Sequence, residues 1–185
     1  MKSKLAIFDL DGTLFDTADV NYSAYKRSLN DIGFDIDYRY FCDFCNGRNY
    51  REFIIPIVGE NNVILEDIHK KKKDYYSLYL SKARENKHLF NVIDLISNDY
   101  YLALVTTASK KNTYEILNYF EKNGLFDLVL TQEDVKNKKP DPEGFLKAMD
   151  YFGIDCKNTV IFEDADVGIL AAKKANCTVF RVEKF

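Results

Sequence analysis

Residues 4–17 read "KLAIFDLDGTLFDT", a short apolar run that ends in three aspartates and one glycine. The apolar part is typical of a buried β-strand. Aspartates are rare in a protein core, because an unpaired buried charge is costly. Asp9 and Asp11 therefore need a chemical reason, and Gly12 allows the backbone to turn sharply and to approach a ligand closely.

Further apolar runs follow, and helical patterns separate them. The predicted strands are 4–10, 100–107, 126–131, 158–164 and 177–182, and the predicted helices between the later strands are 110–123, 142–152 and 165–175. Near-continuous apolar strands that alternate with helices are typical of a parallel sheet covered on both faces. The sequence therefore predicts an α/β fold.

A segment of different character separates the first two strands, and it is far longer than an ordinary crossover connection. It is rich in Tyr, Phe, Lys and Asn, and its helical patterns cover 17–32, 37–45, 49–57 and 62–85. We expect an all-helical insert that leaves the core after the first strand and returns near residues 86–90. The predicted domains are a core of 1–15 and 90–185 and an insert of 16–89.

The overall composition is that of an ordinary folded protein. The chain has 185 residues, a net charge of −3 and 46% apolar residues, which gives no indication of nucleic-acid or membrane binding. The first apolar run is too short for a signal peptide, so a cytoplasmic location is expected. Cys42 and Cys45 form a single "CDFC" motif, which is a weak zinc signal because a closed zinc site needs four ligands. We expect two half-buried thiols on a helix.

Polar residues recur where the predicted strands end, and they are Asp9, Asp11, Thr106, Thr107, Glu163 and Asp164, with Lys139 just before a helix. In an open parallel sheet the carboxyl ends of the strands form the ligand-binding edge. Asp9 and Asp11 are two residues apart in an extended segment, so their side chains can face the same substrate. One carboxylate can attack an electrophilic centre and the other can transfer protons.

The same residues suit a phosphorylated substrate. Asp9, Asp11 and Asp164 offer an oxygen-rich site of the kind that binds Mg²⁺, which would let a carboxylate approach an anionic phosphate. Thr106 supplies a hydroxyl, and Lys139 adds a positive charge where the transition state is negative. The lysine run at 69–74 is interpreted as the solvated face of a helix.

The chain resembles the haloacid dehalogenase superfamily, and in particular its phosphoglycolate phosphatase and β-phosphoglucomutase-like members with a C1-type α-helical cap. The matching stretches are "DLDGT" (9–13), "LALVTTAS" (102–109), "KKPDPEGF" (138–145) and "VIFEDADVGILAAKKA" (160–175), in the order of the family. The resemblance implies a Rossmann-like three-layer sandwich with five parallel strands, and the insert resembles the family's cap.

The resemblance also implies roles for individual residues. Asp9 would be the nucleophile that forms an aspartyl-phosphate, and Asp11 the general acid and base. Asp9, the backbone carbonyl of Asp11 and Asp164 would bind Mg²⁺, with Glu163 supporting the metal directly or through water. Thr106 and Lys139 would hold the phosphoryl group, and Gly12 and Thr107 would lie beside the substrate. The stretch "CNGRNYREF" (45–53) matches the specificity loop, so Arg48 or Arg51 would reach a substrate's carboxylate or second phosphate.

The expected function is a Mg²⁺-dependent phosphatase acting on a small phosphorylated metabolite. The alternative is a sugar phosphomutase of the β-phosphoglucomutase type, although Asn21 stands where such relatives tend to have a histidine. A phosphonate hydrolase would need a Schiff-base lysine in the cap, and the lysines at 70–73 leave that open. A binding protein without catalysis is a further class. The sequence names neither the metabolite nor the oligomeric state.

Overall fold

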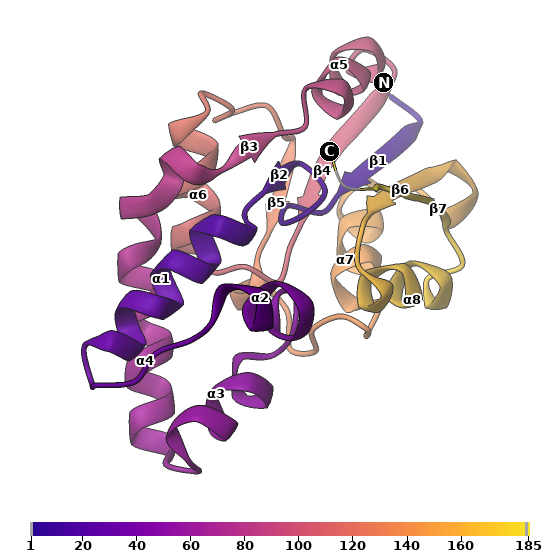
Figure 1. The fold of residues 1–185 in the computed structure, drawn as a ribbon. Helices are drawn as coiled ribbons and strands as arrows, with labels where there is room; N and C mark the ends of the chain where they lie inside the picture. The colour runs from indigo at the N-terminus through magenta and orange to yellow at the C-terminus, as the bar shows by residue number, and fades with distance from the viewer. Residues whose placement is uncertain (1, 184) are drawn as a thin grey trace. The chain divides into compact units, whose positions relative to one another are not determined.

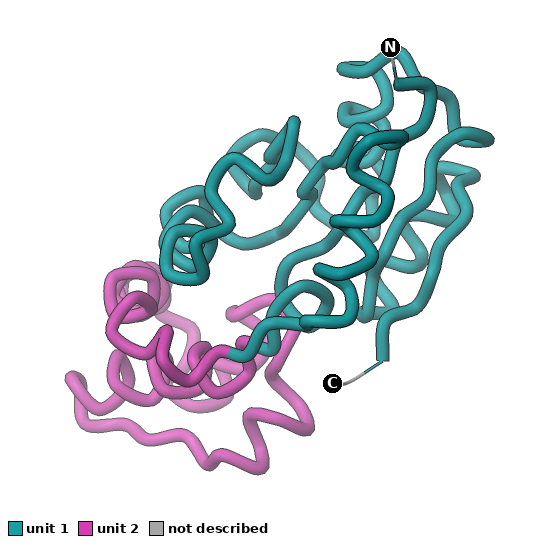
Figure 2. The backbone as a smooth tube through the Cα atoms, turned by 90° about the horizontal axis from the view of Figure 1, so that it is seen from above, with its two compact units in different colours: residues 1–16, 84–185 teal, residues 17–83 magenta. Residues whose placement is uncertain are grey.

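The computed structural model describes residues 2–183 and residue 185, and the chain divides into two compact units (Figure 2). Unit 1 comprises residues 1–16 and 84–185, and unit 2 comprises residues 17–83. The second crossing between the units lies at residues 83 and 84, whereas the sequence places it at residues 89 and 90. The difference arises because the chain rejoins unit 1 through a short strand and a helix that the sequence analysis did not assign.

Unit 1 is built on a parallel sheet of five strands, which confirms the predicted core. The strands are β1 (Lys4–Phe8), β4 (Tyr100–Val105), β5 (Leu128–Leu130), β6 (Thr159–Glu163) and β7 (Thr178–Arg181). Their order across the sheet is β5-β4-β1-β6-β7, and each neighbouring pair is parallel. The order reverses beside β1, so the sheet has its topological switch point at the strand that carries the aspartates.

Helices cover both faces of this sheet and complete a Rossmann-like three-layer sandwich (Figure 1). They are α5 (Lys87–Ile96), α6 (Lys110–Tyr119), α7 (Glu143–Phe152) and α8 (Asp166–Lys174). Crossover connections between parallel strands are right-handed, so the change of direction at β1 sends helices to opposite faces. Figure 1 shows α6 on one side of the sheet and α7 and α8 on the other.

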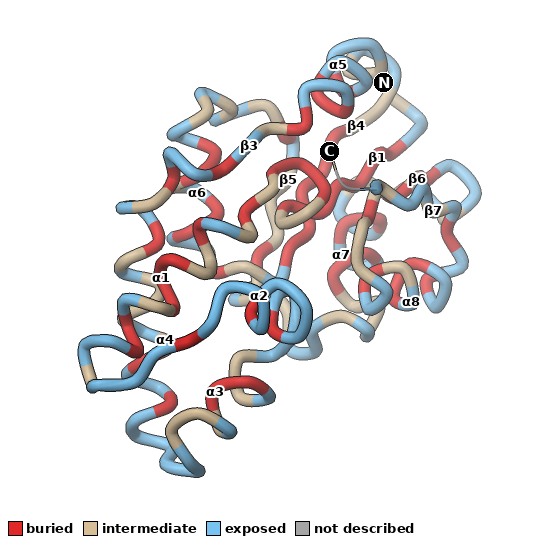
Figure 3. Tube along the Cα trace, in the orientation of Figure 1, coloured by how far each residue is buried: buried red, intermediate tan, exposed pale blue. Residues whose placement is uncertain are grey.

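The core of unit 1 follows from the alternation of side chains along β1. Leu5 and Ile7 pack into one buried cluster with residues of α7 and α8, including Phe145 and Ala171. Ala6 and Phe8 point to the opposite face and are also fully buried. The red part of β1 in Figure 3 reflects the burial of its residues after Lys4 on both faces. A strand that is buried on both sides holds the residue after it, Asp9, in a fixed position.

A two-stranded antiparallel ribbon ties the two ends of unit 1 where unit 2 is inserted. It consists of β2 (Phe15–Asp16) and β3 (Arg84–Glu85), and an ion pair of 2.5 Å joins Arg84 Nη2 to Asp16 Oδ2. The Asn86 side chain donates a hydrogen bond to the carbonyl of Thr13 at 3.1 Å and caps α5 by accepting from the Leu89 N–H. Two-residue strands are too short to give a hydrophobic period, so the sequence did not predict them.

Unit 2 is built of helices, as the sequence predicted. They are α1 (Ala18–Asn30), α2 (Tyr38–Tyr40), a π-helical turn (Phe41–Cys45), α3 (Tyr50–Val58), α4 (Asn62–Tyr75) and a 3-10 segment (Tyr76–Lys82). Its own core contains Tyr25, Leu29, Phe41, Phe53 and Ile68. The rings of Tyr25 and Phe53 meet edge to face with centroids 5.1 Å apart. The aromatic residues of this segment thus divide between its core and its surface, because Tyr38, Tyr40 and Phe44 are exposed.

Within the described part of the chain, the search for membrane-spanning helices finds none of sufficient length and apolar character.

Candidate active site

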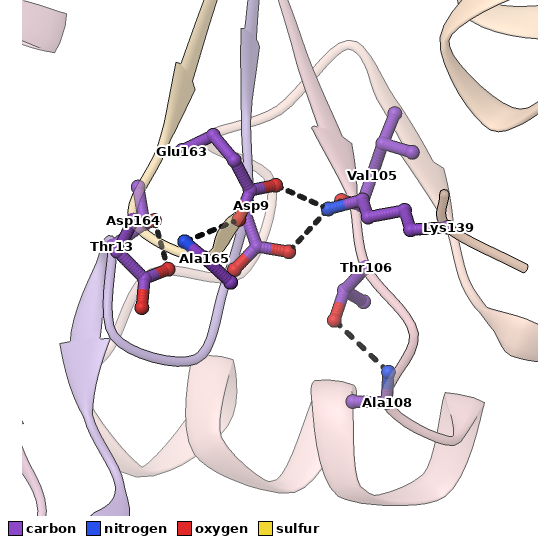
Figure 4. Close-up of polar contacts among 9 residues, drawn as sticks. All are labelled: Asp9, Thr13, Val105, Thr106, Ala108, Lys139, Glu163, Asp164 and Ala165. Atoms are coloured by element: carbon purple, nitrogen blue, oxygen red, sulfur yellow. Dashed lines mark hydrogen bonds and ion pairs between the residues drawn. The ribbon is translucent and has the colours of Figure 1, made fainter. Parts of the chain in front are cut away.

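The predicted polar residues of the core meet at one edge of the sheet (Figure 4). Asp9 follows β1, Thr106 follows β4, and Glu163 is the last residue of β6. Lys139 comes from the connection between β5 and α7. Because all five strands are parallel, their carboxyl ends lie at the same edge, where these side chains converge.

Lys139 is the centre of a buried ionic network. Its Nζ donates to Asp9 Oδ1 at 2.6 Å, to Glu163 Oε2 at 2.7 Å and to the carbonyl of Val105 at 3.1 Å. The side chains of Lys139, Asp9 and Glu163 are 8%, 9% and 2% exposed. Burial alone would lower the pKa of Lys139, but Asp9 and Glu163 outweigh it and raise that pKa. The ammonium group is therefore charged, and all three of its protons have acceptors.

The neighbouring Lys138 has a different environment. It is exposed, and its Nζ donates to the side chain of Gln132 at 2.9 Å. Lys139 thus contacts two carboxylates of the sheet edge, whereas Lys138 donates to an amide side chain.

Three carboxylates share this edge with the ammonium group of Lys139. Oxygen atoms of Asp9, Glu163 and Asp164 lie within 4.8 Å of one another. Burial and then the charge of Glu163 raise the pKa of Asp9 well above its ordinary range, and the same two causes raise the pKa of Asp164 to about 6. The cluster therefore has more negative charge than Lys139 neutralises. A hard divalent cation with oxygen ligands, such as Mg²⁺, fits this donor set.

Asp164 is oriented by the loop that follows β1. Thr13 Oγ1 donates to Asp164 Oδ1 at 2.9 Å, and Thr13 is fully buried. Gly12 has a φ of +88°, and a Cβ built on it would lie 2.1 Å from Asp164 Oδ2. Any larger residue at position 12 would therefore be strained and would displace the Asp164 carboxylate. The glycine of "DLDGT" is required for this close approach as well as for the turn.

Glu163 is fixed by contacts on both of its oxygens. Oε2 accepts from Lys139, and Oε1 accepts from the backbone N–H of Ala165 at 3.1 Å. A Cβ on Gly168 would lie 2.1 Å from Glu163 Oε2, so α8 can pack here only with glycine at this position. The contact from residue 165 is made by its backbone N–H, so it does not depend on the side chain at this position.

Thr106 and Thr107 lie beside the lysine. Thr106 is buried, its N–H donates to the carbonyl of Leu130 at 3.0 Å, and its Oγ1 accepts from the N–H of Ala108 at 3.0 Å. The hydroxyl proton of Thr106 remains for donation to a ligand. Thr107 is exposed. Both threonines and Lys139 line one pocket together with Asn137 and Phe145.

Asp11 and Gly12 form a tight turn before β2. Asp11 pairs with Phe15 in an isolated bridge, and the N–H of Gly12 donates to the carbonyl of Phe15 at 2.7 Å. Asp11 is partly exposed, and its charge contributes to the raised pKa of Asp164. This electrostatic contact places Asp11 next to the carboxylate cluster.

The two predicted arginines belong to unit 2 and are not part of this group of core residues. Arg51 Nη2 forms an ion pair of 2.5 Å with Glu66, and Arg51 Nη1 donates to Asn62 at 2.7 Å. Arg51 therefore joins α3 to α4. Arg48 is exposed in the turn between the π-helical turn and α3.

Several contributors to the site had no role in the sequence analysis. Thr13, Gly168 and the N–H of Ala165 fix the acidic residues, and Glu143 fixes the segment that carries Lys139. Thr13 and Gly168 stand inside the recognised stretches "DLDGT" and "VIFEDADVGILAAKKA", so the signal was their position in those motifs. Their contacts are tertiary and have no local sequence pattern.

Glu143 holds the loop before Lys139. Its two oxygens accept from the N–H groups of Lys136 and Asn137 at 2.9 and 2.8 Å, and Lys147 pairs with it at 2.8 Å. Lys147 first, and then these N–H groups, lower the pKa of Glu143 from its ordinary 4.5 to about 2. A lowered pKa means that the carboxylate stabilises the fold above pH 4.5, and that this contribution is lost as the pH falls towards 2.

The variant Glu143→Gln is therefore expected to be less stable than the wild type at pH 7, with a difference that shrinks as the pH falls below 4.5. Urea denaturation at pH 7, 5 and 3 measures this difference. Asp150→Asn is the matched control, because Asp150 is exposed on the same helix. A stability difference for Glu143→Gln that does not vary with pH would contradict a stabilising role for the charge of the Glu143 carboxylate.

The chain is similar to known proteins over most of its length. The family model for haloacid dehalogenase-like hydrolases matches residues 6–182. A phosphorylated carbohydrates phosphatase of Thermotoga maritima is 30% identical over 91% of this chain and 80% of its own length. A phosphoglycolate phosphatase of Aquifex aeolicus is 27% identical over 93% of this chain and 81% of its own length.

Solved structures share the fold. The crystal structure of CbbY from Rhodobacter sphaeroides in complex with phosphate has a TM-score of 0.86 and 22% identity, and it covers all of this chain and 88% of the other. The family match extends over nearly the whole chain, from the middle of β1 to the residue after β7, and includes every loop of the carboxylate edge. This chain is an enzyme that belongs to the haloacid dehalogenase-like hydrolase family.

Proposed function

We propose that the enzyme is a Mg²⁺-dependent phosphatase that hydrolyses a small phosphorylated metabolite through an aspartyl-phosphate on Asp9. The proposal rests on one observation: Asp9, Asp164 and the buried ammonium group of Lys139 lie close together at one edge of the sheet. The relatives named for phosphorylated carbohydrates and for phosphoglycolate support a small phosphate ester as substrate.

Asp9 is suited to be the nucleophile. Lys139 holds its Oδ1 at 2.6 Å, which orients the carboxylate and leaves Oδ2 to face the substrate. Oδ2 attacks phosphorus and forms a new P–O bond, while the bond from phosphorus to the ester oxygen breaks. Asp11, in its protonated form, gives its proton to that departing oxygen. The products of this half-reaction are the free alcohol and the aspartyl-phosphate.

The second half-reaction returns the enzyme to its starting state. Asp11, now ionised, takes a proton from a water molecule whose oxygen attacks phosphorus. The bond from phosphorus to Asp9 Oδ2 breaks, which releases inorganic phosphate and restores the carboxylate. Asp11 is the partly exposed member of the pair, so water and the leaving group can reach it.

The surrounding groups stabilise the negative charge that moves during both steps. Asp9 and Asp164 would hold Mg²⁺ with the backbone carbonyl of Asp11, and the metal would neutralise charge on the phosphoryl oxygens. Lys139 keeps its charge inside the protein, and the hydroxyl proton of Thr106 can be donated to a phosphoryl oxygen. Glu163 holds Lys139 and so positions this cation.

Unit 2 would act as the cap that selects the metabolite. Arg48 is the better candidate for a contact with a substrate's carboxylate or second phosphate, because Arg51 is already paired with Glu66. The alternative of a sugar phosphomutase has less support. The side chain of Asn21 donates to Thr17 Oγ1 at 3.1 Å, and an amide cannot transfer a proton near neutral pH.

Phosphate release from p-nitrophenyl phosphate tests the proposal. We expect turnover that requires added Mg²⁺, that stops when a chelator is present and that resumes when excess Mg²⁺ is restored. A panel of phosphorylated sugars and small phosphorylated acids then identifies the metabolite class. Release of phosphate from none of these compounds, with isomerisation of a sugar phosphate in the same samples, would refute the phosphatase and favour the mutase.

A further inference from the structure

Unit 2 contains a pair of thiols that the proposed chemistry does not use. Cys42 and Cys45 are both free and lie in the π-helical turn Phe41–Cys45. Cys42 is exposed, whereas Cys45 is buried and its Sγ donates to the carbonyl of Tyr40 at 3.6 Å. The expectation of two half-buried thiols is therefore wrong, since one thiol faces solvent and the other lies inside. The helical location was predicted correctly.

A metal does not account for this pair. Within residues 2–183 and 185, the group of His, Cys, Asp and Glu residues placed to hold a metal is Asp9, Glu163 and Asp164. Two thiolates alone do not complete a tetrahedral site. The pair needs another explanation, if it has a chemical role.

The backbone geometry fits a disulfide. In an α-helix a step of three residues separates two Cα atoms by about 5 Å, and Cys42 and Cys45 stand three residues apart in the π-helical turn. Bridged cysteines have Cα atoms about 4.4–6.8 Å apart, so no large backbone movement is needed.

We propose that Cys42 and Cys45 form a reversible intrahelical disulfide and constitute a thiol oxidation site of unit 2. The exposed Cys42 reacts first, because an oxidant reaches it directly, and the buried Cys45 completes the bond. Burial raises the pKa of the Cys45 thiol to about 11, so Cys45 is the less reactive of the two thiols. The site is independent of the phosphatase function proposed above.

The reaction is a thiol–disulfide exchange with a small disulfide such as oxidised glutathione. The Cys42 thiolate attacks one sulfur of glutathione disulfide, which forms a mixed disulfide and releases one glutathione thiolate. Cys45 loses its proton to solvent and attacks the Cys42 sulfur, and the second glutathione leaves. Two protein thiols and one small disulfide give one protein disulfide and two small thiols, so electrons and protons balance.

Bond formation would act on the turn that follows. The Asn46 N–H donates to the carbonyl of Phe41 at 2.9 Å, and the Arg48 N–H donates to the carbonyl of Cys45 at 3.0 Å. The thiol of Cys42 also interacts with the Tyr38 hydroxyl, which donates to Asp19 on α1 at 2.6 Å. A disulfide would remove this thiol from Tyr38 and cross-link the turn that leads into residues 46–49.

Peptide mass spectrometry gives a direct test, because trypsin places this cysteine pair and the other two cysteines in three different peptides. Cleavage after Arg39 and Arg48 places Cys42 and Cys45 together in residues 40–48, while Cys156 and Cys177 fall in residues 148–157 and 175–181. The full chain is equilibrated in glutathione buffers of increasing oxidised fraction, and free thiols are then alkylated. We expect the peptide 40–48 to lose two hydrogen atoms and to escape alkylation, and dithiothreitol to reverse this.

Single variants separate the disulfide from simple modification. Cys45→Ser is expected to stop at a stable glutathione adduct on Cys42, and Cys42→Ser to leave Cys45 as a thiol. Cys156→Ser is the matched control and should leave the disulfide of peptide 40–48 unchanged. A wild-type chain that stops at the same Cys42 adduct as Cys45→Ser would overturn the proposal. So would a wild-type chain that keeps both thiols at every buffer ratio.

Discussion

Replacement of Lys139 by methionine is expected to lower the free energy of unfolding by about 3–5 kcal/mol, because it removes one partner of a buried ion pair and leaves the others uncompensated. Lys139 is the cation that contacts both Asp9 and Glu163, and the side chains of all three are less than one-tenth exposed. Methionine keeps most of the length of the side chain, so little of the loss is a packing effect. Urea denaturation in chelator-containing buffer measures the change.

The same variant should lose activity. Lys139 supplies a fixed positive charge next to the nucleophile, and loss of one such group typically lowers kcat by about 10²–10³-fold. Added Mg²⁺ is expected to recover part of the lost stability, since the metal neutralises Asp9 and Asp164, but not the lost turnover. This difference separates the structural contribution of the lysine from its catalytic one.

Lys138→Met is the matched control for this result. It changes the adjacent residue in the same way, but Lys138 is exposed and contacts the Gln132 side chain. We expect it to keep both stability and activity near those of the wild type. If Lys139→Met were no less stable than Lys138→Met, the ionic network would not support the core.

The variant Asp9→Asn should also lose activity, but unlike Lys139→Met it should keep its stability. Asparagine cannot form the acyl phosphate, so turnover is expected to fall by about 10⁴-fold or more. Its amide oxygen can still accept the hydrogen bond from Lys139, and the change removes a charge that Glu163 and Asp164 oppose. In chelator-containing buffer the variant should unfold at the same temperature as the wild type, or at a higher one.

The control for Asp9→Asn removes a charge from elsewhere in unit 1. Asp166 is exposed and pairs with Arg181 at 2.9 Å, so Asp166→Asn should retain activity and Mg²⁺ dependence. Thermal unfolding followed by circular dichroism, with phosphate release from the same samples, compares the two. Residual Mg²⁺-dependent turnover of Asp9→Asn near the wild-type rate would show that Asp9 is not the nucleophile.

The sheet and the position of its polar residues could be predicted because they depend on local pattern. A strand that is buried on both faces, such as β1, must be a continuous apolar run, so its end is visible in the sequence. The topology rule then places Asp9, Thr106 and Glu163 at one edge without any knowledge of distances.

The contacts inside the site could not be predicted in the same way. A shift of a few ångströms decides whether the Glu163 carboxylate contacts a metal or Lys139. A residue at the end of a strand can make either contact, so the sequence does not distinguish them. The structure has its oxygens on Lys139 and the N–H of Ala165. The engagement of Arg51 by Glu66 likewise needs the packing of α3 on α4.

Helix α5 shows a different kind of omission. Its signals are present in the sequence, because Asn86 caps it and Leu89, Phe90 and Ile93 form a buried stripe with helical spacing. The expected return of the chain to the core, near residues 86–90, overlaps only the start of this helix, and the sequence analysis assigns no helix beyond it. The ribbon before it left no comparable signal.

The ribbon of β2 and β3 also has a consequence for the modularity of this chain. Asp16 and Arg84 are paired across it, so the polypeptide leaves unit 1 and re-enters it at neighbouring positions. Antiparallel neighbours can be joined by a two-residue turn, such as Asn-Gly, at small entropic cost. Residues 17–83 therefore form an inserted unit. This unit could be removed, or replaced by another domain whose two ends join the chain at Asp16 and Arg84.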